Sequence, residues 1–440
     1  MKSKALKELC FPNKCGIYGI PASAEDFDET KIRYLRITDI SEDGKLLDSD
    51  KKSVSDSQIE KYLLEEGDIV FARTGNSTGK SYFHEIKNGE LAFAGFLIKF
   101  SLDPEKVNPK YLRYYTITKH YKQWVENFSL GSTRGNLNAN SFGNCPIPIP
   151  SRKQQDFLVK VLSDLDAKIE VNNKINQELE EIAKTIYDYW FVQFDFPDAN
   201  GKPYKASGGK MVYNEALKRE IPEGWEVRSV SGFADCNKWN ITKESRYDKI
   251  NYLDTSSLTE NVIDSFQKLD FDRDKIPSRA QRIVSKNDIL YSTVRPNQLH
   301  YGIIKRPIEN LIASTGFAQI RSNDSKITND FIFQILSQDY VSARLQQIAV
   351  GSVSAYPSIS HNDIMELKIA LPLNDELINK ATSIFCQYND KVALNLEENQ
   401  KLAELRDWLL PMLMNGQVTV GEAKEELGMV AEENAKYVEV

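Results

Sequence analysis

The longest regular pattern of apolar and polar positions runs from Ser151 to Phe191, a stretch without proline or glycine. Its apolar residues recur at steps built from three and four, at Leu158, Val161, Leu165, Ile175, Leu179, Ile182, Ile186 and Tyr189. Such spacing predicts a long amphipathic helix with an apolar seam that can pair with another helix. At ~1.5 Å per residue it would span roughly 60 Å, longer than a core helix needs. The pattern returns near the end of the chain, at Ile384, Tyr388, Leu402, Leu405, Leu409 and Met412.

Each of these helix patterns follows a block in which strand-like and polar stretches alternate. In the first block, Lys31–Ser41, Glu65–Thr74 and Glu90–Leu102 are rich in β-branched and aromatic residues, which favours strands. Asn108–Phe128 has the spacing of a helix. Gly131–Phe142 is polar and poor in apolar residues, which predicts a loop. The block is therefore expected to mix α and β structure.

The second block repeats the first in the same order. Five of its segments match those of the first block, namely Lys249–Asn261, Ser285–Gln298, Leu311–Ser322, Ile327–Ile348 and Gly351–Ile364. Asp68 and Asp288 lie 220 positions apart, and so do Gly131 and Gly351. Chance alignment of a few apolar residues would not hold such an offset over so long a stretch, so two homologous halves are predicted.

This duplication predicts an α+β fold with two homologous globular α/β domains and two long antiparallel helices. The helices are expected to form a coiled coil with pseudo-two-fold symmetry. The expected parts are globular domains at 1–150 and 225–373, long spacer helices at 151–192 and 374–415, a linker at 193–224 and a C-terminal tail at 416–440.

Two asparagines fall on the apolar seams of the long helices. Asn172 and Asn395 lie 223 positions apart, each near the centre of its helix. In an antiparallel pair they would meet at the midpoint, where a polar seam residue fixes the register at some cost in stability. The alternative is that the seam is locally exposed there.

Composition and charge narrow the class of protein. The chain has 440 residues, 41% of them hydrophobic, which is enough for real cores. The start of the chain has no continuous apolar segment typical of a signal peptide, and no stretch is apolar enough to span a membrane. Five scattered cysteines indicate reduced thiols and a cytoplasmic protein. The net charge of −7 argues mildly against a polyanion-binding protein that acts alone.

No reaction centre can be assembled from the sequence. Gly75–Ser81 has three residues between its glycines where a phosphate-binding loop needs four. The four histidines show no ligand spacing, and Cys10 with Cys15 lacks a second pair, so buried thiols are favoured over zinc. We therefore expect no catalytic, cofactor-binding or metal-binding residues in this chain.

Polar loops at equivalent positions in the two blocks are more informative. Their side chains include arginines, which can fork onto guanine, amides, which can pair with adenine, and hydroxyls, which suit bases or phosphates. The candidates are Arg73, Thr74, Asn76, Ser77, Lys80, Ser132, Thr133, Arg134 and Asn136 in the first block, and Thr293, Arg295, Asn297, Gln298, Ser352, Ser354 and Tyr356 in the second. Ordinary polar turns use the same residue types, but their equivalent placement in both halves favours a function in DNA binding.

Four segments carry a resemblance to a known family. They are PYKASGGKMVYNEALKREIPEGWEV (Pro203–Val227), EEGDIVFARTGNSTG from Glu65, GSTRGNLN from Gly131 and LRDWLLPMLMNGQVTV (Leu405–Val420). With the repeat of a block followed by a long helix, the chain resembles the specificity (S) subunit of type I restriction–modification systems. The second half departs from the first where STVRPNQLHYG (Ser292–Gly302) replaces the glycine-bearing loop.

The resemblance implies that the two blocks are target recognition domains that read a bipartite target in double-stranded DNA, with the helices as a ruler between the half-sites. Two methyltransferase (M) subunits would dock on the chain and modify adenine with S-adenosylmethionine. Restriction (R) subunits would add ATP- and Mg²⁺-dependent translocation and cleavage. The chain itself would be a non-catalytic subunit. Four aromatic residues near the helix ends could anchor a partner or only cap the coiled coil: Tyr187, Trp190, Phe191 and Trp408.

Two other hypotheses remain open at this point. One is a fused DNA methyltransferase or nuclease, against which the missing cofactor motifs weigh. The other is a coiled-coil scaffold that binds proteins without DNA. Replacement of Arg73, Arg134 and Arg295 separates the scaffold from a DNA-recognition subunit, because only the latter needs these side chains to bind DNA.

Overall fold

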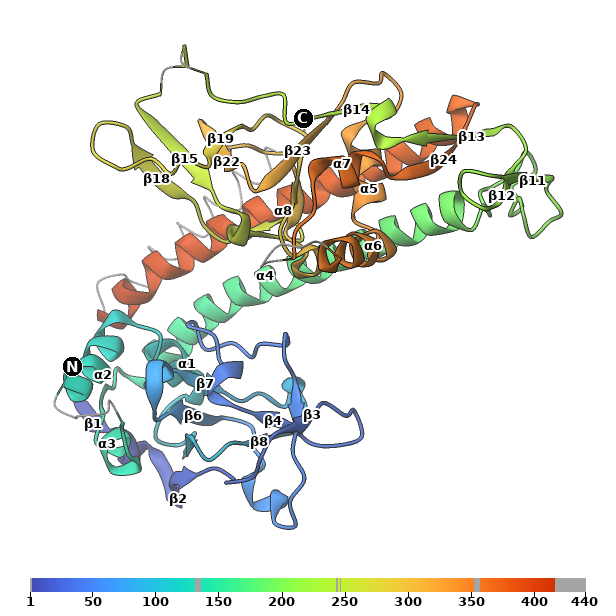
Figure 1. Cartoon of the computed structure of the whole chain (residues 1–440). Helices are drawn as coiled ribbons and strands as arrows, with labels where there is room; N and C mark the ends of the chain where they lie inside the picture. The colour runs from blue at the N-terminus through green and yellow to red at the C-terminus, as the bar shows by residue number, and fades with distance from the viewer. Residues whose placement is uncertain (1, 131–135, 243, 246, 352–356, 416–440) are drawn as a thin grey trace. The chain divides into compact units, whose positions relative to one another are not determined.

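The protein divides into two compact units, and each contains one globular block and parts of both long helices. Unit 1 comprises Met1–Ile169 and Lys401–Val440, and unit 2 comprises Glu170–Gln400. The computed structural model (Figure 1) describes residues 2–130, 136–242, 244–245, 247–351 and 357–415. The expected C-terminal tail, 416–440, lies outside the described residues.

Unit 1 is built on two four-stranded sheets. One has the strand order β2-β9-β6-β7 and is antiparallel, while the other has the order β3-β5-β4-β8 and pairs β4 with β8 in parallel. A separate two-stranded sheet joins β1 to β10. The strands are β1 (Ser3–Ala5), β2 (Cys10–Tyr18), β3 (Glu25–Asp26), β4 (Arg33–Leu35), β5 (Lys52–Ser53), β6 (Asp68–Ala72), β7 (Ser81–Phe83), β8 (Leu91–Phe93), β9 (Leu97–Leu102) and β10 (Pro146–Pro148).

The helices of unit 1 refine three of the expected elements. The helix predicted over Asn108–Phe128 is two helices, α1 (Pro109–Tyr115) and α2 (Lys119–Leu130), because the Thr118 hydroxyl accepts from the Tyr121 amide and starts a new helix. The loop predicted over 131–142 contains the start of α3 (Ala139–Gly143), capped by Asn138. The strand predicted over 90–102 is two strands, β8 and β9, in different sheets.

Unit 2 repeats most of this topology, but in its second sheet the added edge strand β19 pairs with β22, whereas in unit 1 the edge strand β3 pairs with β5, and unit 2 has a further pair, β16 with β17. Its sheets have the orders β14-β23-β20-β21 and β18-β15-β22-β19, again with one parallel pair, β15 with β22, and a separate pair joins β13 to β24. The strands are β13 (Trp225–Ser229), β14 (Ala234–Cys236), β15 (Lys249–Leu253), β16 (Leu258–Thr259), β17 (Val262–Ile263), β18 (Gln267–Asp270), β19 (Ala280–Ile283), β20 (Asp288–Ser292), β21 (Tyr301–Ile304), β22 (Leu311–Ser314), β23 (Phe317–Ser322) and β24 (Lys368–Pro372). The short helices are α5 (Asn329–Leu336), α6 (Asp339–Val350) and α7 (His361–Met365).

The duplication extends to the register of individual residues. Ile69 pairs with Phe100 in unit 1, and Ile289 pairs with Ile320 in unit 2, each 220 positions further along. The turn before the central strand is also the same, because the buried carboxylate of Asp68 accepts from the Glu65 amide (2.9 Å), as that of Asp288 accepts from the Ser285 amide (2.8 Å). The two homologous α/β domains predicted from the offset are confirmed.

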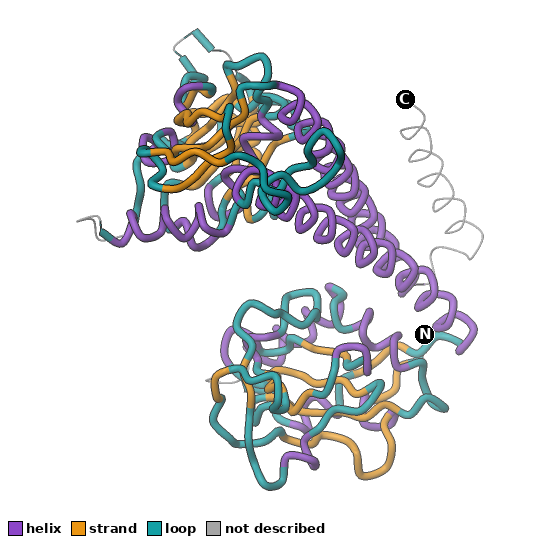
Figure 2. Tube along the Cα trace, turned by 90° about the vertical axis from the view of Figure 1, so that its right-hand side faces the viewer, coloured by secondary structure: helices purple, strands orange, loops and turns teal. Residues whose placement is uncertain are grey.

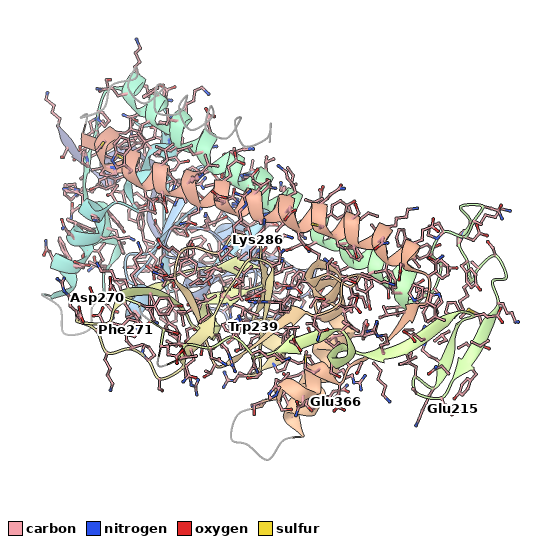
Figure 3. The ribbon with its side chains drawn as sticks, turned by 90° about the horizontal axis from the view of Figure 1, so that it is seen from above. Glu215, Trp239, Asp270, Phe271, Lys286 and Glu366 are labelled. Carbon is pink, nitrogen blue, oxygen red and sulfur yellow. The ribbon has the colours of Figure 1, made fainter. Side chains whose placement is uncertain are left out.

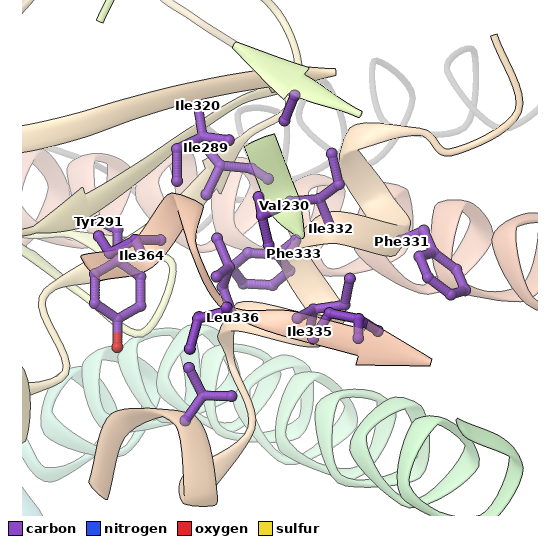
Figure 4. Packing of buried hydrophobic residues seen from close by; sticks show 14 of the residues in the cluster. Val230, Ile289, Tyr291, Ile320, Phe331, Ile332, Phe333, Ile335, Leu336 and Ile364 are labelled. Atoms are coloured by element: carbon purple, nitrogen blue, oxygen red, sulfur yellow. The ribbon is translucent and has the colours of Figure 1, made fainter. Parts of the chain in front are cut away.

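The core of unit 2 forms where α5 packs on the sheet. Every residue of α5 is buried, including the polar Asn329, Asp330 and Gln334. Figure 4 shows Ile332, Phe333 and Leu336 among side chains from other elements, such as Ile289 of β20 and Val230. Burial of this helix fixes the face of the block that meets the long helices.

The long helices are α4 (Arg152–Tyr187), which continues as a π-helical turn over Asp188–Val192, and α8 (Asp375–Asn415). In unit 1 the start of α4 packs against the end of α8, and in unit 2 the end of α4 packs against the start of α8. In both units the helices are therefore antiparallel, as predicted. The parts of α4 and α8 in unit 2 lie side by side (Figure 2).

The seam of unit 2 contains a buried layer of asparagines. Asn172 donates to Asn399 (2.9 Å) and Asn395 donates to Asn176 (2.7 Å). Asn176 and Asn399 are 223 positions apart, like Asn172 and Asn395, so the two hydrogen bonds are the same contact repeated by pseudo-two-fold symmetry. Asn172 and Asn395, the two predicted register residues, are thus both buried. They do not bond to each other at the midpoint, because each bonds to an asparagine one helical turn from the other, Asn399 for Asn172 and Asn176 for Asn395.

The linker at 193–224 is ordered around a hairpin. β11 (Met211–Asn214) pairs with β12 (Arg219–Pro222), and Glu215 lies in the turn between them. Phe196 stacks on Tyr204 (4.7 Å between ring centroids) and on Trp225 (5.3 Å). The hairpin lies at the opposite end of the unit from Asp270, the last residue of β18, and Phe271 in the turn that follows (Figure 3).

Candidate nucleic-acid interface

In unit 1 the two predicted polar loops meet at the end of β6. The Arg73 amide donates to the Phe96 carbonyl (3.0 Å), and the Arg73 carbonyl accepts from the Leu137 amide (3.0 Å). The backbone of Arg73 is thus held between the β8–β9 turn and the segment that follows residues 131–135. The loop of Arg73 to Lys80 and the start of the second loop therefore share one site.

The fold holds the side chain of Arg73 in place without satisfying all of its hydrogen-bond donors. Its guanidinium lies over the Tyr18 ring, 5.1 Å from the centroid, which is a cation–π contact. Its Nε atom is buried and has no hydrogen-bond partner among the described residues. Arg73 as a whole is only half-buried, and a guanidinium carries four further N–H donors that can contact a ligand.

The rest of the first loop divides into exposed and engaged residues. Asn76 is exposed, whereas Thr74 and Ser77 are half-buried. The Lys80 ammonium is paired with Glu42 (Nζ to Oε1, 2.8 Å), so this candidate already has an acceptor inside the chain.

The loop is anchored to helix α2 through Gly79. The Tyr121 hydroxyl donates to the Gly79 carbonyl (2.9 Å), and burial raises the pKa of Tyr121 well above its ordinary value, so the donor proton is retained. A Cβ atom on Gly79 would lie 2.6 Å from Val125, and the residue has φ of +89°. Only glycine fits this close approach, which fixes the loop on the helix.

Unit 2 holds its equivalent loops by the same hydrogen bonds. The Thr293 amide donates to the Gly316 carbonyl (2.9 Å), and the Thr293 carbonyl accepts from the Ile359 amide (2.9 Å). Thr293 therefore occupies the position of Arg73. Its hydroxyl donates to the Gly316 carbonyl (2.9 Å), so the side chain that replaces the arginine is engaged in the chain.

The arginine of the second loop stands two residues later. Arg295 is exposed, has a left-handed backbone (φ 49°), and donates its amide to the Pro357 carbonyl (2.9 Å). A 3-10 turn over Pro296–Gln298 follows it, where Asn297 and Gln298 are exposed and the Asn297 amide donates to Gln346 of α6 (3.2 Å). A 3-10 turn also occupies Gly75–Ser77 in unit 1.

The structure brings some of the predicted residues together and leaves others undescribed. The described candidates form one loop cluster in each unit, and Asn136 is exposed beside that of unit 1. Ser132, Thr133, Arg134, Ser352, Ser354 and Tyr356 lie outside the described residues.

Two aromatic residues at the unit 1 cluster were not predicted. Tyr18 is 40% exposed beneath the Arg73 guanidinium and accepts a hydrogen bond from the Ala139 amide (3.1 Å). Phe96, whose carbonyl holds Arg73, is 57% exposed, which is unusual for so large an apolar side chain. Residues from four distant parts of the chain meet here, and the only local signal was an aromatic residue directly before a glycine in GIYG.

Other chemistry can be placed more briefly. Strand β7, not a helix, follows Gly75–Lys80, so the loop lacks the helix N-terminus on which phosphate-binding loops depend. Cys10 is buried and donates to the Leu6 carbonyl (3.3 Å), and burial raises its pKa. The described residues contain no group of three or more histidine, cysteine, aspartate and glutamate side chains placed to hold a metal ion. No helix within the described ranges is long and apolar enough to cross a membrane.

Comparison with known proteins gives one family. The family model for the type I restriction modification DNA specificity domain matches residues 1–181 and 222–406. The chain is 26% identical over 323 residues to the type I restriction enzyme MjaIX specificity subunit of Methanocaldococcus jannaschii, covering 71% of this chain and 70% of that protein. It is 23% identical over 382 residues to the putative MjaX specificity subunit of the same organism, covering 84% and 82%. Its fold is similar to the crystal structure of a type I restriction–modification S subunit from M. genitalium, with a TM-score of 0.50, 16% identity and coverage of 94% and 95%.

Proposed function

The chain belongs to the family of type I restriction–modification DNA specificity subunits, and we propose that the loop cluster of each unit reads one half of a bipartite DNA target. Two matches of the family model, one on each block, support two separate readers. Different side chains on the same loop backbone support the reading of two different half-sites.

The observation that carries this proposal is the Arg73 guanidinium. It is held over Tyr18, and its buried Nε atom lacks an acceptor among the described residues. Guanine offers two acceptors in the major groove, and a phosphate offers several, so either suits the other N–H groups of this guanidinium. Lys80 is weaker support, because Glu42 already pairs with it.

The chemistry is assigned to partner subunits. Arginine and amide side chains, which form the exposed parts of both clusters, donate hydrogen bonds but do not act as nucleophiles or bases at neutral pH. We propose that this chain is non-catalytic, that two M subunits bring S-adenosylmethionine, and that R subunits bring the ATP- and Mg²⁺-dependent activities. Such a complex would act on DNA in the cytoplasm.

The test is to sequence the methylated bases of a host that carries the M subunit with or without this chain. We expect an interrupted motif with adenine methylation in both halves, present only when both genes are expressed. Methylation by the M subunit alone at the same motif, or by this chain alone, would contradict the proposal.

A further inference from the structure

A buried ionic cluster joins the globular block of unit 2 to helix α8. Lys305, which follows β21, pairs with Asp330 at the start of α5 (2.9 Å) and with Asp390 of α8 (3.0 Å). Asn389 of α8 donates to the same Asp330 carboxylate (2.8 Å). Lys305, Asp330 and Asn389 are each no more than 5% exposed, so solvent screens the contacts among these three little, whereas the Asp390 side chain is half-exposed. Burial opposes the charged form of Lys305, but Asp330 and Asp390 raise its pKa.

Unit 1 has an ionic cluster at the same place, against α4. Glu85, which follows β7, pairs with Lys110 at the start of α1 (2.7 Å) and with Arg113 (3.2 Å). Arg113 reaches Asp166 of α4 (3.5 Å), and Tyr114 donates to Asp166 (2.8 Å). Burial opposes the charged form of Glu85, but Lys110 and Arg113 lower its pKa.

The two clusters carry opposite charges at equivalent positions. Glu85 and Lys305 are 220 positions apart, and so are Lys110 and Asp330, so both members of the block's ion pair are reversed. On the helices, Asp166 corresponds to Asn389 and Ala167 to Asp390, each 223 positions apart. In unit 1 the helix carboxylate is Asp166, which contacts Arg113 of the first block. In unit 2 it is Asp390, one position further along, which contacts Lys305 of the second block.

We propose that these reversed clusters make each globular block complementary in charge to its own long helix, so that neither block fits the helix of the other. This inference goes beyond the proposed function. If each block reads one half-site, the matching also fixes the order of the two half-sites along the chain, and that consequence rests on the proposed function. The shared fold alone would let the blocks exchange places.

The argument follows from the contacts that an exchanged block would make. The first block on α8 would bring Glu85 against Asp390, and Arg113 would lose its contact with Asp166 and keep only Glu85. The second block on α4 would bring Asp330 to hydrogen-bond distance of Asp166. Two carboxylates that share a buried site cannot both ionise without a large cost.

The first experiment uses point variants of the full chain and follows thermal unfolding. N389D puts the residue type of position 166 beside Asp330, and we expect the melting temperature to fall by roughly 5 °C or more. D330N in the same chain removes the repulsion and should restore most of the loss. The control is Q387E, which adds one negative charge at an exposed position of α8 and should change little. Equal effects of N389D and Q387E would overturn the proposal.

The second experiment exchanges a block. In a chain where a copy of residues 2–150 replaces residues 225–373, we expect lower thermal stability than in the parent. N389D with D390A gives α8 the residues of α4 and should raise the stability of this chimaera, although the same pair lowers that of the parent. The same sign in both contexts would overturn the proposal. Because no DNA is involved, these outcomes are independent of whether the chain reads DNA.

Discussion

Arg73 and Thr293 stand on the same backbone position in two copies of one fold, yet they offer different groups to a ligand. Both are held by an amide-to-carbonyl hydrogen bond from the turn between two sheets and by a second from the following loop. The Thr293 hydroxyl is bonded to Gly316, whereas the Arg73 Nε atom has no acceptor within the described chain. The backbone thus supplies the position, and the side chain is free to change what is recognised.

We expect R73A to weaken DNA recognition at one half of the target only. Loss of one bidentate or phosphate contact costs about 1–3 kcal/mol, or roughly a 5- to 150-fold loss of affinity. R295A should affect only the other half. Binding to duplexes mutated in either half, measured with the M subunit present, separates the two effects.

The control for this prediction is R152A, which removes one positive charge from unit 1 at the start of α4, away from the loop cluster. If R152A and R73A weaken binding equally, the effect is one of net charge. Unchanged DNA binding in both R73A and R295A would favour a scaffold that binds proteins without DNA.

His84 gives unit 1 a pH dependence. It is 2% exposed, and burial lowers its pKa below the ordinary value of 6.5. The unfolded chain therefore takes up a proton near pH 6.5 that the folded chain refuses, so stability falls as the pH drops through and below this value. Urea unfolding between pH 7.5 and 5.5 should show a smaller fall for H84Q than for the wild type. H120Q, at an exposed histidine of the same unit, serves as the control.

At the scale of elements, the paired helices combine an apolar seam with an asparagine layer. Leu158, Leu162 and Leu165 of α4 are buried with Leu402 and Leu409 of α8 in unit 1. The asparagine layer lies in unit 2, where its hydrogen bonds repeat by symmetry. Buried amides of this kind favour one register, because a slipped pair would leave them without partners.

We expect N395A to destabilise unit 2 by about 1–3 kcal/mol, because it leaves the Asn176 carbonyl oxygen buried without a donor. The double change N176L with N395L removes both polar groups and should recover much of this loss. N379A, at an exposed asparagine of α8, is the matched control and should cost less than about 0.5 kcal/mol. Denaturant unfolding measures all three, and equal losses in N395A and N379A would show that the layer contributes nothing.

At the scale of the whole molecule, the charge balance bears on how DNA is bound. The net charge is −7, and the Lys80 side chain of the unit 1 cluster is paired with an acid of the same unit. Phosphate neutralisation by this chain alone should therefore be small, and most of it should come from partner subunits.

This predicts a difference in salt dependence. For the isolated chain, the logarithm of the DNA affinity should fall only shallowly with the logarithm of the salt concentration, whereas the complex with the M subunit should show a much steeper slope. Fluorescence anisotropy with a duplex carrying the target measures both. Equal slopes would mean that the phosphate contacts belong to this chain.

The sequence by itself determined the duplication, the two long helices and the position of the polar loops. The long helices follow from the local periodicity of apolar residues. The duplication and the equivalent loops follow from the constant offset between the two halves, which a single sequence is enough to show. It also led to the expectation that Asn172 and Asn395 lie on the helix seam, since a seam position depends only on spacing along one helix.

Only the tertiary structure decided which side chains meet. Tyr18 lies under Arg73, Glu42 forms an ion pair with Lys80, and the seam asparagines bond one turn apart. The sequence could not show these contacts, because each joins residues distant in the chain and depends on how two elements pack. The reversed ion pairs of the two blocks were equally hidden in the sequence. The sequence gives the charge of each side chain, but which opposite charge it pairs with is decided only by the packing of the globular block against its long helix.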